Sequence, residues 1–146
     1  EEENYREKSL RIEKTTKLRC ARLMDRFADE ITECRGSGAL HGIFIKTEKT
    51  FLSRLLKLLP LEINKDEQFL SKLIVASLAD WMYRHKKIYV LFSTADEIAF
   101  MFTPSLVMED DEINYFFDSV EDAFEKGIRK IITEFITKQF SKTLHG

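Results

Sequence analysis

The chain has few residues that interrupt regular structure, with 5 glycines and 2 prolines among 146 residues. Three of the glycines lie close together, at Gly36, Gly38 and Gly42, and the prolines stand singly at Pro60 and Pro104. Glycine and proline mark turns, so this scarcity predicts long helices joined by few loops. No internal repeat or low-complexity tract is present.

Cysteine is also scarce, with Cys20 and Cys34 the only two in the chain. Two cysteines are enough for one disulfide bond, but two isolated thiols in a mixed α/β chain are more typical of a reducing compartment. The opening residues, Glu1 to Arg6, have neither the basic start nor the apolar stretch of a signal peptide. We therefore expect a cytoplasmic protein with both thiols reduced.

The chain lacks an excess of charge of either sign, because 23 basic and 25 acidic residues leave a formal charge of -2. It offers no basic field for nucleic acid or anionic lipid, and we expect neither nucleic acid nor membrane as a partner. No apolar run approaches the roughly 20 residues needed to cross a bilayer. The composition, 44% hydrophobic and 33% charged, indicates one globular domain over residues 1–146.

Apolar residues with helical spacing predict three long helices, over about 5–33, 66–86 and 110–138. The charged residues 1–18 are interpreted as a linking helix. The glycines after Arg35 are expected to end the first of the three predicted helices, over about 5–33. Four carboxylates, Glu109 to Glu112, suit the positive start of the last helix. That helix is longer than a small sheet requires, so part of its apolar face is expected to contact another body.

Three strands are predicted between these helices, over about 39–46, 88–92 and 97–103. The second is continuously apolar, which suggests burial on both faces, and Pro104 ends the third. The sequence therefore predicts an α+β fold with a small three-stranded sheet covered by long helices. Residues 47–65 are interpreted as an amphipathic insertion that packs on the domain's own core. Alternatively, it contacts a carrier or partner protein or forms part of a channel for a long substrate.

The sequence predicts no catalytic and no metal site. His41 and His85 have no second ligand at a metal-binding spacing, which favours structural roles. Asp110 and Asp111 are adjacent and would point apart on a helix, which favours capping over acid–base chemistry. Ser37 follows a predicted helix rather than a strand, unlike the serine of a nucleophile elbow.

Three segments have a distinctive order. The first is residues 33–43, E-C-R-G-S-G-A-L-H-G-I, which are similar to the pattern V-R-G-x-G-L-x-x-G-I. The second is residues 102–106, F-T-P-S-L, which are similar to F-x-P-P-L. The third is residues 109–114, which are similar to T-E-E-E-I-D. In this order they resemble the C-terminal small domain of class III (ω-type) pyridoxal-phosphate-dependent aminotransferases of fold type I. In that family the first segment leads from a helix into the first small-domain strand. The resemblance covers about residues 16–135 and implies the family's small-domain fold.

The resemblance implies a domain that helps to close an aminotransferase active site, orient the substrate and form a dimer. The Schiff-base lysine and pyridoxal 5'-phosphate would belong to the large domain, which this chain lacks. We therefore expect the chain alone to bind no cofactor and not to be catalytic. Expected partners are its own large domain, a second copy and a carrier or partner protein. One alternative is a non-catalytic protein-interaction module of aminotransferase ancestry, and another is an unrelated α+β domain in which the three matches are coincidence.

Two residues are candidates for substrate binding. As the resemblance implies, most family members carry an arginine three residues before the first proline of the F-x-P-P-L turn, where it grips a substrate carboxylate. Met101 occupies that position here and cannot make such a pair. The substrate then lacks a carboxylate at that end, another group binds it, or the domain has lost this task. Arg35, in the R-G-x-G segment, is the second candidate.

Overall fold

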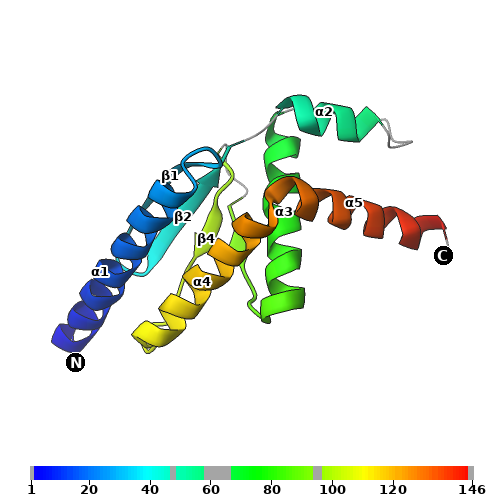
Figure 1. Cartoon of the computed structure of the whole chain (residues 1–146). Helices are drawn as coiled ribbons and strands as arrows, with labels where there is room; N and C mark the ends of the chain where they lie inside the picture. Colours follow the sequence, from blue (N-terminus) through cyan, green and yellow to red (C-terminus); the bar gives the residue numbers. More distant parts are fainter. Residues whose placement is uncertain (1, 47–48, 58–66, 94–96, 145–146) are drawn as a thin grey trace.

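A computed structural model describes residues 2–46, 49–57, 67–93 and 97–144 (Figure 1). The described residues form five helices: α1 (Glu2–Arg26), α2 (Lys49–Lys57), α3 (Glu67–Lys86), α4 (Asp110–Lys126) and α5 (Ile128–Leu144). They also form four strands: β1 (Ile31–Ser37), β2 (Leu40–Ile45), β3 (Leu91–Phe92) and β4 (Phe100–Phe102). No described helix has the length and apolar character that a transmembrane span requires.

The four strands form one antiparallel sheet in the order β1-β2-β4-β3. Helices α1 and α4 lie side by side over one face of this sheet, and α3 crosses α5 beside them (Figure 1). The α+β class is confirmed. The described sheet has four strands rather than the three predicted, because a strand replaces the end of the first predicted helix.

The predicted helix over 5–33 is too long, because α1 ends at Arg26 and β1 begins at Ile31. The buried side chains of Phe27 and Ile31 continue the helical spacing of α1, which explains the error. The chain leaves the helix in a turn closed by the N–H of Ile31 on the carbonyl oxygen of Phe27, 2.9 Å apart. Spacing alone does not separate one more helical turn from such a reversal.

The segment Gly36-Ser37-Gly38 therefore lies in a β-hairpin and does not cap a helix. Gly38 has a φ of 59°, the left-handed conformation that tight turns favour. A Cβ atom on Gly36 would lie 2.1 Å from the carbonyl oxygen of Leu40, so the two strands approach too closely there for any side chain. Glycine spacing thus predicted a turn correctly, but not its kind.

The predicted helix over 110–138 is two helices, because Gly127 adopts a φ of 95° and separates α4 from α5. Its N–H donates to the carbonyl oxygens of Ala123 and Phe124, which ends α4. The predicted acidic start is confirmed: Glu109 and Glu112 form a capping box at the first turn. The break lets α5 turn onto α3, where a straight helix would have continued past it.

The expectation that residues 88–92 are buried on both faces is wrong. Only Leu91 and Phe92 pair, with β4, and β3 is an edge strand. Tyr89 is 82% exposed and Leu91 57%. An apolar run of this length fits an edge strand whose one face is uncovered as well as a central strand, so the sequence pattern did not distinguish them.

Two apolar clusters form the core. The larger one lies between the sheet and helices α1, α3 and α4, and includes Phe100, Phe102, Phe116 and Phe117. The smaller one joins α3 to α5 through Leu70, Ile74, Ile132 and Ile136. Phe51 of α2 packs against this second cluster, so this part of the predicted insertion 47–65 contacts the domain's own core. Residues 47–48 and 58–65 of that insertion lie outside the described residues.

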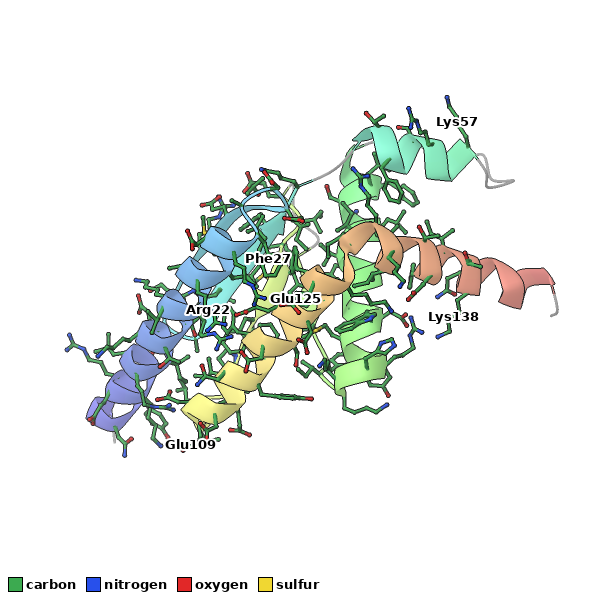
Figure 2. All side chains as sticks on the ribbon, viewed as in Figure 1. Arg22, Phe27, Lys57, Glu109, Glu125 and Lys138 are labelled. Carbon is green, nitrogen blue, oxygen red and sulfur yellow. The ribbon has the colours of Figure 1, made fainter. Side chains whose placement is uncertain are left out.

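Helices α1 and α4 are also joined by ion pairs centred on Glu121, whose side chain is almost fully buried. Its carboxylate accepts hydrogen bonds from Arg19 at 2.9 Å, Arg22 at 3.2 Å and Arg26 at 2.5 Å. Figure 2 shows Arg22 on the side of α1 that faces α4. These three arginines recur at helical spacing, so they share one face of α1.

Candidate functional site

The two faces of the sheet differ because side chains alternate along each strand. In β2 and β4, Ile43 and Phe100 turn toward the helices and are fully buried. Their neighbours Gly42 and Met101 turn the other way. We call this second surface the open face, and it is formed by Arg35, Leu40, Gly42, Phe44, Leu91 and Met101. Two of its apolar side chains, Leu40 and Leu91, are more than half exposed.

Arg35 and Met101 lie in one row across the open face. Arg35 pairs with Gly42 on the adjacent strand, Gly42 pairs with Met101, and Met101 pairs with Leu91. Because Gly42 has no side chain, the surface between Arg35 and Met101 is hollowed. The hollow has a volume of about 920 Å³ and is lined by Arg35, Gly36, Ser37, Leu40, Gly42, Phe44, Ser93, Glu97, Ala99 and Met101. The register thus brings the two candidate residues to one site.

The guanidinium of Arg35 is held by three neighbours. It lies over the ring of Phe44, 4.3 Å from the centroid, and forms ion pairs with Glu97 and, at 3.4 Å, with Glu33. The hydrogen bond to Glu97 raises the pKa of Arg35, so the group stays charged. Two carboxylates therefore offset its one positive charge. A substrate anion would have to displace Glu97 to bind Arg35 bidentately.

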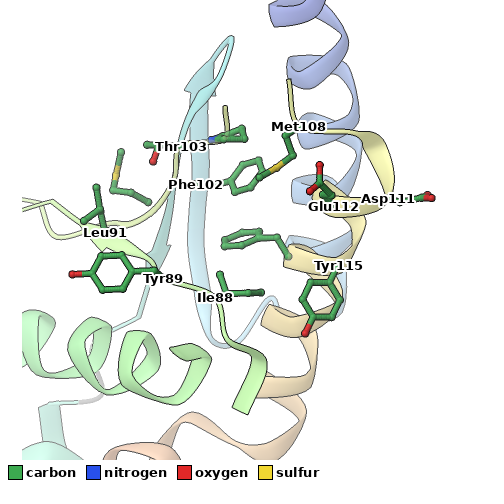
Figure 3. Close-up of a pocket in the computed structure, with 12 residues that line it drawn as sticks. Ile88, Tyr89, Leu91, Phe102, Thr103, Met108, Asp111, Glu112 and Tyr115 are labelled. Atoms are coloured by element: carbon green, nitrogen blue, oxygen red, sulfur yellow. The ribbon is translucent and has the colours of Figure 1, made fainter. Parts of the chain in front are cut away.

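Met101 also borders a second depression, which we call the edge groove, beside the exposed edge of β3. Tyr89 and Leu91 lie on one side of it, Met108 and Tyr115 on the other, with Phe102 between them (Figure 3). Its volume is about 580 Å³, and its lining is mainly apolar. Met101 lines both depressions, so the open face and the edge groove adjoin at this residue.

His41 and His85 each lie within hydrogen-bond distance of a backbone carbonyl oxygen. His41 is buried with its Nε2 atom 3.0 Å from the carbonyl oxygen of Gly38, and burial lowers its pKa. His85 stacks on Trp81 and its Nδ1 atom lies 3.0 Å from the Trp81 carbonyl oxygen. Within the described part of the chain, no group of three or more histidine, cysteine or acidic residues is arranged to hold a metal ion.

Comparison with protein-family models and with curated proteins finds no match to this chain. Sequence reasoning selected Arg35 and Met101 but missed Glu97, Phe44 and the edge groove. Glu97 lies between β3 and β4, and only the folding of the sheet brings it to Arg35, 62 positions away in the sequence. The alternation of Leu40, Gly42 and Phe44 was the available signal for a shared strand face.

Proposed function

We propose that this chain is the small domain of a class III pyridoxal-phosphate-dependent aminotransferase. In that enzyme it would close the active site, orient the substrate and contribute to a dimer. The observation that carries the proposal is the open face, where Arg35 and Met101 lie in one row over a hollow. Among the described residues the helices pack on the opposite face, and the exposed apolar residues of the open face favour contact with another body.

The proline turn and the acidic segment support the proposal, because the first follows β4 and the second begins α4. The segment that resembles R-G-x-G departs from the family, since it forms the β1–β2 hairpin and does not lead from a helix into a strand. All three thus lie at turns or element ends, where particular residue types are required. Met101 and Pro104 both line the edge groove, which connects the proline turn to the open face.

The described residues do not fit pyridoxal phosphate by themselves. The hollow has no lysine in its lining, and its one guanidinium is paired with two carboxylates. A phosphate site needs uncompensated donors, such as free N–H groups or cations. The cofactor and the lysine that binds it would therefore be supplied by the large domain, with the open face of this chain set against it.

The proposal predicts a difference between this chain alone and the complete product of its gene. The complete protein should show the visible absorbance band of bound pyridoxal phosphate, and residues 1–146 alone should not. Absorbance spectra of both proteins, each incubated with the cofactor and then dialysed, measure this. A reading frame that starts near Glu1, or a complete protein without the band, would contradict the proposal and favour the non-catalytic interaction module.

That alternative is supported by a specific observation. Met101 has no polar group for a carboxylate, and Arg35 is neutralised by Glu33 and Glu97. A surface without a free cation is poorly suited to carboxylate recognition but well suited to apolar contact. The same surface would also suit an aminotransferase whose substrate has no carboxylate at that end.

A substitution at Met101 tests whether the open face meets the substrate of an aminotransferase. In the complete enzyme, Met101→Arg should raise kcat/KM for a substrate with a carboxylate at that end about tenfold, relative to the uncharged analogue. A hydrogen bond to a charged group contributes about 1.5 kcal/mol or more, enough for such a ratio. Met101→Leu keeps the site apolar and is the matched control. An unchanged ratio in Met101→Arg would show that the open face does not meet this part of the substrate.

A further inference from the structure

The two cysteines of the chain lie against one another. Cys20 is on α1 and only 6% exposed, Cys34 is on β1 and partly exposed, and both thiols are free. Both side chains line one small hollow of about 300 Å³, together with Lys17, Ala21, Met24, Arg35, Gly36 and His41. The interaction between the two thiols lowers the pKa of Cys20 and raises that of Cys34.

The fold explains why these residues meet. Cys20 belongs to the apolar stripe of α1 that packs on the sheet. Along β1, Arg35 faces the open face, so the preceding residue, Cys34, faces the helices and packs against the main core cluster. Contacts between α1 and β1 hold the two elements together at this level. The thiol pair is therefore a built feature of the helix–sheet contact.

We propose that Cys20 and Cys34 form a modification site, at which a hydroperoxide joins α1 to β1 through a disulfide. One thiolate attacks the peroxide, whose O–O bond breaks to release an alcohol or water and leave a sulfenic acid. The second thiol attacks that sulfur, an S–S bond forms, and water leaves. The two sulfurs lose two electrons in total, and the peroxide accepts them.

The surroundings favour this reaction. The hydrogen bond from Cys34 lowers the pKa of Cys20, which raises the fraction of reactive thiolate in the pair. Lys17 and Arg35 line the same hollow, where Lys17 is paired with Glu13 and Arg35 with Glu33 and Glu97. Since Cys34 precedes Arg35, the bond would also fix the strand that carries Arg35 against α1.

The test uses the full chain, reduced and then freed of reductant. After treatment with hydrogen peroxide, alkylation of the remaining thiols and tryptic digestion without reduction, mass spectrometry should detect peptides 20–22 and 27–35 as one linked species. Cleavage after Arg22 and Arg26 separates the cysteines, so only a disulfide keeps these peptides together. Dithiothreitol should release them. Alkylated or sulfinic cysteines without the linked species, or linkage between two chains, would overturn the proposal.

Two controls keep the result interpretable. Cys20→Ser and Cys34→Ser should each abolish the linked species, and the remaining sulfenic acid should react with dimedone. Treatment of the unmodified chain in denaturing urea covers the case in which a serine variant does not fold. Urea separates the two sulfurs, so linkage should be slower there than in the folded chain. Equal or faster linkage in urea would show that the fold does not present the pair.

Discussion

Replacing Phe117 with alanine should lower the free energy of unfolding by about 3 to 5 kcal/mol, the usual cost of removing a buried phenylalanine ring. Phe117 is fully buried on α4, and its ring lies 5.2 Å from that of Phe116 and 5.4 Å from that of Phe102. The substitution would leave a cavity where α4 meets the sheet and remove two aromatic edge contacts. Urea denaturation followed by far-UV circular dichroism measures the loss.

Tyr89→Ala is the matched control. This aromatic side chain is 82% exposed and contacts Tyr83 edge to face, with the ring centroids 6.3 Å apart. Its truncation should cost less than about 1 kcal/mol, since an exposed ring contributes little burial. Similar decreases in the free energy of unfolding for both variants would show that the Phe117 ring is not buried between α4 and the sheet.

Glu121→Ala should lower the free energy of unfolding by about 2 to 3 kcal/mol. The substitution leaves Arg19, Arg22 and Arg26 without their shared carboxylate, and Arg19 is itself largely buried. Breaking a fully buried ion pair costs about 3 to 5 kcal/mol, and the exposure of Arg22 and Arg26 reduces that figure. Denaturant unfolding of the two proteins at the same pH and salt concentration checks the value.

Glu125→Ala is the control for position. Glu125 lies one helical turn after Glu121 and pairs with Arg26, but about half of its side chain is exposed. Exposed ion pairs typically contribute less than about 1 kcal/mol, so this variant should be near neutral. If Glu125→Ala were as destabilising as Glu121→Ala, burial of the carboxylate would not be the cause.

The fold was predictable where one pattern had one structural meaning. The apolar spacing of α3 predicted that helix closely. The four carboxylates from Glu109 to Glu112 predicted where α4 begins. Prediction was wrong where a local pattern fits two structures. Phe27 and Ile31 keep helical spacing across a turn, and the apolar run ending at Phe92 lies at a sheet edge. Only contacts between distant segments decide such cases.

The candidate site was predictable only as separate residues. Arg35 and Met101 were selected through a resemblance, and nothing in the sequence placed them in one row of the same sheet. Their meeting depends on Gly42 pairing with both strands, which is set by register. The arginines at positions 19, 22 and 26 were a signal that sequence reasoning missed, since their spacing marks one charged helix face awaiting an acidic partner.

The break at Gly127 divides the stability of the molecule. Before it, α4 shares the main cluster with the sheet and α1, whereas α5 contributes Ile131 to that cluster and otherwise packs on α3 through the smaller one. Because fewer buried side chains hold α5 than α4, its amides should exchange with deuterium sooner than those of α4. The C-terminal arm would then open and close as a separate cooperative unit while the sheet and its two covering helices remain folded.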